Sequence, residues 1–426
     1  MKFNLFMLPT IPATVDEREA LRPIGRNTDK YQQMLEQVRE LAILAEDVGF
    51  DAISMTEHHF HSEGYEISVA PLTILTDIAA RTSRIKVATL GLVLPTWDPV
   101  RVAEECAVVD QLTKGRLCVG IARGYQDRWA NVLGQKYHAT GTPMDGSEID
   151  DKNRELFEEI FQIMRQCWTQ DTVRVQSRNY EIPSPFSGIQ RWPQEDFTGR
   201  FGAEGEMEDG KVMRVSVVPR PYQQPHPPIW QPFSVSEKTV RWCAEEAIVP
   251  WILISHPPLF RTLCEAYRDS AVGAGHGFGA GENVGVFRSL HLADTTEKAI
   301  ELGAQAQGLF LSYFGAFGFI EAFRLPEDEE RYPGQRLPPE EWTYDRARRN
   351  SYALGGTVDD VKRQMEELYE NVPIEWFGWY FDQGLLSLDE AKRQLEMFGE
   401  HIIPEFRDRP HGGQAVGPGA PASPAA

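Results

Sequence analysis

Three of the ten histidines of this chain, His58, His59 and His61, stand within four consecutive positions. They follow a short, mostly apolar run, residues 51–56, which is typical of a strand covered on both faces, and Glu57 directly precedes them. Parallel α/β sheets and barrels place their chemistry at the carboxyl ends of the strands. A neutral imidazole can accept a proton near neutral pH, so we expect acid–base chemistry at this strand end. These residues alone leave open a polar loop with surface histidines.

A second group of residues has the chemistry of an anion site. Ser234 and Ser236 directly precede an expected helix, and a serine at a helix start leaves backbone N–H groups free for a phosphate. Arg123, followed by Gly124 and Tyr125, comes after another apolar run, and an arginine can add a bidentate contact. Simple helix capping by the serines and a surface ion pair of Arg123 are the alternatives.

These residues need a framework that brings strand ends together, and the chain supplies alternating strands and helices. Eight strands joined by helices over short connections indicate parallel βαβ units and an α/β fold of the (β/α)8 TIM-barrel type. Further polar residues at the expected strand ends are Ser255, His256, His291 and Asp382. The expected strands are 2–8, 51–56, 85–94, 116–122, 229–233, 248–255, 284–292 and 375–381. The expected helices are 29–48, 71–81, 99–112, 147–168, 236–246, 257–271, 296–308, 357–370 and 387–406.

Two insertions interrupt the alternation, one after the fourth strand and one late in the barrel. Residues 171–228 are polar, and we expect 172–180 and 212–218 to pair as a hairpin around a segment, 184–210, that is rich in Pro, Gly and acidic residues. Residues 310–342 mix aromatic side chains with a charged run, and a connection of this length is usually functional or disordered. We expect this second insertion to be a mobile lid.

The rest of the expected organisation is simple. Residues 9–27 are expected to be a long loop, residues 1–407 form a single barrel domain, and residues 408–426 are a disordered tail rich in Gly, Pro, Ala and Ser.

Composition excludes several classes of partner. The chain has 426 residues and a net charge of −20, which argues against nucleic acid or an anionic membrane as the main partner. We find no secretory signal and no apolar stretch of membrane-spanning length. The five cysteines show no CxxC pair, which favours reduced thiols in a cytoplasmic protein.

Three stretches resemble the bacterial-luciferase-like flavin monooxygenases: TEHHF at 56–60, TLGLVL…ARGY at 89–125, and GTVDDVKRQMEEL…EWFGWYFDQG at 356–384. The resemblance implies a barrel that binds reduced FMN at its carboxyl face. It also implies that O2 reacts with this flavin to give a peroxyflavin that oxidises an organic substrate. A separate flavin reductase would supply the reduced FMN, transiently or by diffusion, and we expect a homodimer. The substrate is expected to be mainly hydrophobic, because the expected barrel mouth carries many aromatic residues: Phe60, Trp97, Trp230, Phe233, Trp251, Phe314 and Phe317.

The resemblance also assigns roles to individual residues. His58 matches the catalytic histidine of the family, Arg123 its phosphate-binding arginine, and Leu90-Gly91 the place of a non-proline cis peptide under the flavin ring. Ala122 stands where luciferase itself has a cysteine, which argues against light emission. The cofactor-binding residues that we predict are Leu90, Gly91, Arg123, Gly124, Tyr125, Ser234 and Ser236, and we predict no metal ligand.

Residues 57–61, which carry the three histidines, are called the histidine loop below. Within it, we expect Glu57 and His59 to hold the loop and to fix the tautomer of His58. We expect His61 to be exposed.

Three other functions remain open. A metal-dependent barrel hydrolase would use His58, His59, His61, His256 and His291 as ligands, but it lacks a clear carboxylate bridge and leaves Arg123 and the serines unused. The other two are a deazaflavin-dependent oxidoreductase with a similar barrel and a non-catalytic relative that binds flavin.

Overall fold

The computed structural model describes residues 1–381 and 385–411. It consists of two compact units, one made of residues 1–54, 62–66 and 230–426 and the other of residues 55–61 and 67–229. Asp382 and most of the expected tail, residues 412–426, lie outside the described residues.

The first unit is built on a parallel sheet whose strands lie in the order β10-β11-β12-β14-β1. Successive side chains of these strands are buried on both faces, as the apolar runs predicted. A further strand, β13, pairs with β12 and was not expected, because two of its four residues are glycines. The strands are β1 (Lys2–Met7), β10 (Ile229–Ser234), β11 (Val249–Ile252), β12 (Gly285–Leu292), β13 (Ala353–Gly356) and β14 (Trp376–Tyr380).

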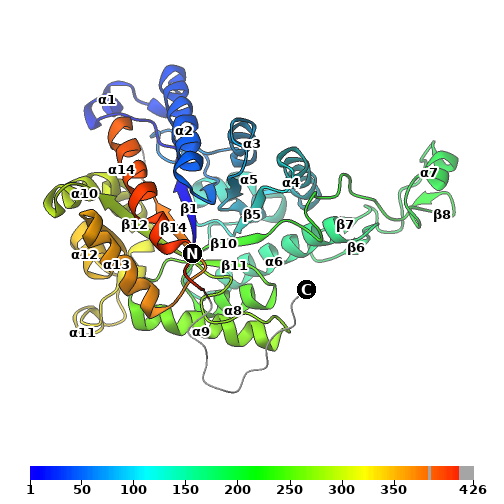
Figure 1. Ribbon diagram of the computed structural model, residues 1–426. Coiled ribbons are helices and arrows are strands. Elements are labelled where there is room, and N and C mark those ends of the chain that lie inside the picture. Colours follow the sequence, from blue (N-terminus) through cyan, green and yellow to red (C-terminus); the bar gives the residue numbers. More distant parts are fainter. Residues whose placement is uncertain (382–384, 412–426) are drawn as a thin grey trace. The chain divides into compact units, whose positions relative to one another are not determined.

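Helices cover this sheet, and α10 and α14 both pack against β12 (Figure 1). Local capping residues set the helix ends. At the start of α2, for example, the Asn27 side chain accepts a hydrogen bond from the Lys30 amide, and Gly49 ends this helix in the left-handed conformation. The longer helices are α2 (Thr28–Val48), α8 (Glu237–Glu245), α9 (Pro257–Gly273), α10 (Thr296–Tyr313), α13 (Val358–Asn371) and α14 (Leu388–His401). Shorter ones are α1 (Val15–Ala20), α12 (Tyr344–Arg349) and α15 (Ile403–Phe406). Because α1 lies within residues 9–27, the expected long loop there is wrong.

The second unit contains the parallel strands β3 (Lys86–Thr89), β5 (Leu117–Ala122) and β4 (Leu92–Val93). The chain enters this unit at the end of β2 (Ala52–Met55). The expected strand 85–94 is thus divided at Leu90 and Gly91. Its helices are α3 (Pro71–Arg81), α4 (Pro99–Thr113), α5 (Asp127–Leu133) and α6 (Glu148–Thr169).

The insertion after α6 differs from the expected hairpin. The two expected partners meet only at a bridge between Val173 and Val215, and the rest of the segment forms two smaller antiparallel pairs. A helix, α7, lies close to the second of these pairs and was missed, because it is only seven residues long, contains a glycine and buries no side chain (Figure 1). The elements are β6 (Val175–Gln176), β7 (Glu181–Ile182), α7 (Glu195–Phe201), β8 (Met207–Glu208) and β9 (Lys211–Val212).

The expected lid, residues 310–342, is folded into short helical turns and α11 (Asp328–Arg331). Its aromatic side chains pack on the sheet side of the unit: the ring centroids of Phe310 and Tyr380 lie 5.0 Å apart, and those of Phe323 and Tyr352 4.3 Å apart. A role of this segment as a lid stays a prediction.

Candidate functional site

The histidine loop follows β2, and His58 is buried, with 6% of its surface exposed. Its Nδ1 lies 3.4 Å from the Thr56 hydroxyl and its Nε2 lies 3.5 Å from the Tyr125 hydroxyl. Burial, together with the neighbouring His59, lowers the pKa of His58 to about 3. The ring is therefore neutral near pH 7. Such a weak base acts by accepting a hydrogen bond, or by taking a proton from a group that is itself acidic.

Glu57 holds this loop in place. Its carboxylate accepts hydrogen bonds from the Val93 amide at 2.7 Å and the Trp97 indole at 3.0 Å, and lies 2.9 Å from His59 Nε2. These bonds fit the expected loop-holding role of Glu57 and His59. The contacts of the His58 nitrogens given above are with Thr56 and Tyr125, so they lend no support to the expected control of the His58 tautomer by Glu57.

His61 is buried, with 4% of its surface exposed, so the expectation that it is exposed is wrong. Its ring stacks on that of His58 with centroids 5.3 Å apart, and its Nε2 lies 3.3 Å from Gln126 Oε1. His61 therefore shields one face of His58 from water. The polar sequence around His61 gave no indication that its side chain is buried.

Two aromatic residues complete the surroundings of His58. Trp129 is fully buried, and its ring centroid lies 6.4 Å from that of His58 and 6.0 Å from that of Tyr125. Its indole nitrogen has no hydrogen-bond partner among the described residues. Gly124 has a positive φ of 82°, and a Cβ there would lie 2.7 Å from the Trp129 ring. Sequence reasoning missed Trp129, although it lies only four positions after Tyr125.

Arg123 follows β5 and is mostly buried, with 15% of its side chain exposed. It forms an ion pair with Asp150, in the first turn of α6, and Asp150 also accepts a 2.8 Å bond from the Thr142 hydroxyl. Burial and the nearby Arg154 lower the pKa of Arg123 from its usual value. The ion pair that we left open is thus present, but it is largely buried, and it leaves other guanidinium donors for a ligand.

The Leu90-Gly91 peptide is cis, as the resemblance implied. At Gly91 a Cβ would lie 2.7 Å from the backbone of Gly120 and Ile121, so only glycine fits here against β5. The Leu90 amide donates a 2.7 Å hydrogen bond to the Met55 carbonyl, which ties this segment to the end of β2.

The two serines lie in the first unit, whereas His58 and Arg123 lie in the second. Ser234 is buried and donates a 3.3 Å bond to the Gln231 carbonyl, whereas Ser236 is exposed and caps α8. Their meeting with Arg123 at one phosphate stays a prediction.

His291, which the metal alternative would use, is buried in the first unit with its Nδ1 3.1 Å from Gln394 Oε1. Within residues 1–381 and 385–411, no three His, Cys, Asp or Glu side chains are placed to hold a metal ion. In the same part of the chain, no helix is long and apolar enough to cross a membrane.

Comparison with known proteins gives the context of this site. The oxygenase component of the flavin-dependent trigonelline monooxygenase of Acinetobacter baylyi is 24% identical over 399 residues, which cover 88% of this chain and 91% of that protein. The oxygenating constituent of 3,6-diketocamphane monooxygenase from Pseudomonas putida, solved with FMN, has a TM-score of 0.69 and 19% identity, and the match covers 95% of this chain and 98% of that one. An F420-dependent secondary alcohol dehydrogenase, solved with an F420–acetone adduct, has a TM-score of 0.61 and 15% identity over 96% and 99% of the two chains.

The solved structures confirm the predicted fold, an α/β barrel of eight parallel strands with insertions. The family model described as "Luciferase-like monooxygenase" matches residues 1–375, which is most of the chain. The protein is therefore an oxidoreductase that belongs to the luciferase-like monooxygenase family.

Proposed function

We propose that this protein is the oxygenase component of a flavin-dependent monooxygenase that uses reduced FMN and O2 to oxidise a mainly hydrophobic organic substrate. The observation that carries the proposal is a buried, neutral His58 whose Nε2 lies 3.5 Å from the hydroxyl of Tyr125, two residues after Arg123 at the end of β5, in a chain of this family. A relative that covers most of the chain is itself an oxygenase component, which supports a separate flavin reductase as the partner.

The residues present fit FMN. Arg123 is a cation with donors beyond those that Asp150 uses, and Arg154 adds positive charge near it, as a phosphate dianion requires. The buried indole nitrogen of Trp129 is a donor that has no acceptor among the described residues. Reduced FMN, when bound, supplies the electrons with which O2 is activated. We propose that the cis peptide at Leu90-Gly91 and the serines Ser234 and Ser236 also contact this cofactor.

The roles of the surrounding side chains follow from their contacts. His58, held neutral, accepts a hydrogen bond or a proton from the substrate or from the oxygen species that reacts with it. His61, Tyr125 and Trp129 cover its ring and exclude water, which protects reactive species from hydrolysis. Glu57 keeps the loop, and with it His58, in place.

Two further expectations belong to this proposal. We propose a homodimer. We also propose a cytoplasmic location, because all five cysteines are buried and none forms a disulfide, as is typical of a reducing compartment.

A deazaflavin-dependent oxidoreductase is the second candidate, because a solved structure of this fold binds F420. The two functions differ in their use of oxygen. We expect O2 uptake with supplied reduced FMN to rise when a suitable hydrophobic substrate is added, with one oxygen atom appearing in the product. Substrate turnover with reduced F420 in the absence of O2, and none with FMN, would establish the second candidate instead.

The cofactor site is tested by flavin titration of an Arg123→Ala variant. Loss of a charge-assisted contact to the phosphate should weaken FMN binding by about 1.5–3 kcal/mol and leave riboflavin binding nearly unchanged. Arg101→Ala, which removes an exposed arginine on α4, is the matched control. An equal loss for FMN and riboflavin would contradict a phosphate contact.

A further inference from the structure

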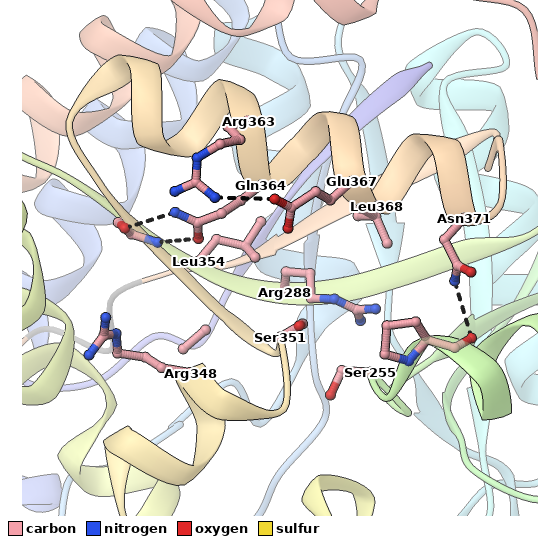
Figure 2. A pocket seen from close by; sticks show the side chains of 13 residues that line it. Ser255, Arg288, Arg348, Ser351, Leu354, Arg363, Gln364, Glu367, Leu368 and Asn371 are labelled. Carbon is pink, nitrogen blue, oxygen red and sulfur yellow. Dashed lines mark hydrogen bonds and ion pairs between the residues drawn. The ribbon is translucent and has the colours of Figure 1, made fainter.

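A cavity of about 300 Å³ lies in the first unit, between the strands β12 and β13 and the helix α13 (Figure 2). Its lining includes three arginines from three different elements, Arg288 from β12, Arg348 from α12 and Arg363 from α13. The one acidic residue of the lining is Glu367. The cavity therefore carries an excess of positive charge in a chain whose net charge is −20.

Arg288 is the buried member of this set, with 1% of its surface exposed. Alternation along β12 sends the preceding residue, Phe287, to one face of the sheet, where it stacks on Trp251 with ring centroids 5.0 Å apart. Arg288 lies on the other face, where its guanidinium is 5.6 Å from the ring centroid of Phe260 on α9. Figure 2 shows its side chain in the middle of the labelled residues.

The charge of Arg288 has no acidic partner among the described residues. One guanidinium nitrogen donates a 2.7 Å bond to the Phe287 carbonyl, and the buried Nε has no partner in that part of the chain. Burial lowers the pKa of Arg288 to about 10, so the group is still charged near neutral pH. A buried charge is destabilising by several kcal/mol unless a partner neutralises it.

Three other polar side chains of the cavity wall already have hydrogen-bond partners in the chain. Gln364 bonds the Gly355 amide at 3.1 Å and the Gly355 carbonyl at 3.0 Å, and Asn371 donates to the Pro257 carbonyl at 3.1 Å. Ser255 donates to Asn350. These bonds hold the wall in place, whereas the buried Nε of Arg288 has no acceptor among the described residues.

The two other arginines stand nearer to solvent. Arg363 is 61% exposed and pairs with Glu367 at 3.1 Å, and Arg348 is 35% exposed and 4.0 Å from Asp345. Such exposed pairs contribute little and can be exchanged for a ligand contact. A ligand that enters between them would reach the guanidinium of Arg288.

We propose that this cavity binds a phosphate group, either as inorganic phosphate or as the phosphate of a small phosphomonoester, with Arg288 as its anchor. Arginine recognises phosphate through parallel N–H···O bonds, and a phosphate has enough oxygens to contact several arginines at once. The anion supplies the negative charge that Arg288 lacks. At about 300 Å³ the cavity is at the lower end of the range for small-molecule sites, which leaves room for a small organic group beside the phosphate.

The test is the thermal unfolding of the full chain at constant ionic strength, with chloride replaced by inorganic phosphate. We expect Tm to rise with the logarithm of the phosphate concentration, because the ligand binds only the folded chain. Parallel series with glycerol phosphate and with acetate separate the ester and a plain carboxylate from the free ion. Equal Tm values in phosphate and chloride would overturn the proposal.

Variants assign the effect to this cavity. Arg288→Met should abolish the phosphate shift and, without phosphate, leave Tm equal to or above that of the unsubstituted chain, because an unpaired buried charge is gone. Arg288→Lys, which keeps the charge with fewer donors, should reduce the shift without abolishing it, and it serves if the methionine variant does not fold. Arg349→Met, on the same helix as Arg348 but outside the lining, should keep the full shift. A full shift in Arg288→Met would refute the site.

The outcome does not depend on the proposed flavin chemistry. Arg288→Met should leave FMN titration unchanged, whereas Arg123→Ala should weaken FMN binding and keep the phosphate shift of this cavity. If the phosphate-dependent rise in Tm is lost in Arg123→Ala but kept in Arg288→Met, the phosphate binds at Arg123 instead.

Discussion

Arg288 and Arg346 are two nearly fully buried arginines of the same unit with opposite surroundings. Arg346 is 3% exposed and bonds both carboxylate oxygens of the buried Asp328, one of them at 3.1 Å, and it bonds Glu341 as well. Arg288 has the carbonyl of Phe287 and, among the described residues, no carboxylate. A buried charge whose partners belong to the chain serves the fold, whereas one that lacks them is available to a ligand.

The histidine loop repeats this contrast on a smaller scale. The donors to Glu57 from Val93 and Trp97 lie at 2.7 and 3.0 Å, which are ordinary hydrogen-bond lengths. The contacts of His58 with Thr56 and Tyr125 are long, at 3.4 and 3.5 Å. We therefore expect substitutions of Glu57 and Asp328 to change stability first, and those of His58 to change function first.

The largest effect is expected for turnover in His58→Ala. General acid–base catalysis contributes roughly 10²–10⁴-fold, so turnover should fall by that factor while FMN still binds. Stopped-flow turnover and flavin titration measure the two properties, and His401→Ala, at a half-buried histidine with 40% of its side chain exposed, is the control. Turnover equal to that of the unsubstituted enzyme would show that His58 has a structural role and no catalytic one.

The next effect is expected for Asp328→Asn. Removing the charge leaves Arg346 buried with Glu341 as its remaining carboxylate, and breaking a buried pair typically lowers the free energy of unfolding by about 3–5 kcal/mol. Urea unfolding measures the loss. Glu329→Gln changes the neighbouring, mostly exposed carboxylate and should stay within about 0.5 kcal/mol. The contrast between the two arginines fails if Asp328→Asn is as stable as this control.

A smaller loss of stability is expected for Glu57→Gln. An amide accepts weaker hydrogen bonds than a carboxylate, and bonds to a charged group contribute about 1.5–3 kcal/mol. Turnover should fall together with stability, because the loop carries His58. A pure loss of turnover, with urea unfolding unchanged, would show that Glu57 acts in the chemistry.

The smallest effect, counted per pH unit, is expected on mild acidification. The pKa values of His58 and His291 are lowered by burial to about 3 and about 4, whereas an unfolded histidine titrates near 6.5. Their stabilisation is complete above about pH 6.5 and is lost as the pH falls toward about 4 and 3, because the unfolded chain then binds more protons. The slope is at most about 1.4 kcal/mol per pH unit for each histidine. Urea unfolding between these pH values measures it, and His291→Gln should make the slope shallower.

Much of the framework was predictable from the sequence, because apolar runs and helical spacing report burial directly. Helices α2, α3, α4 and α6 and the strands β1, β5 and β12 fall within a few residues of their expected bounds. The cis peptide at Leu90-Gly91 was also expected, through the resemblance.

The missed features depend on contacts that no local pattern encodes. The short strand β13 has two glycines, and its partner β12 lies far away in the sequence. His61 is buried because it stacks on His58, and Asp328 is paired with an arginine eighteen positions away. Arg288 stands in a strand that otherwise reads as core, so only the structure shows that its face of the sheet borders a cavity.

The five buried cysteines make the protein a convenient background for site-specific labelling. Burial raises the pKa of the Cys106 and Cys264 thiols and brings that of Cys167 to about 12, so the reactive thiolate is scarce at neutral pH. A cysteine introduced by Ser351→Cys, at an exposed position of the cavity lining, would react far faster with a maleimide dye. Its fluorescence could then follow ligand entry in real time, without first removing any natural thiol.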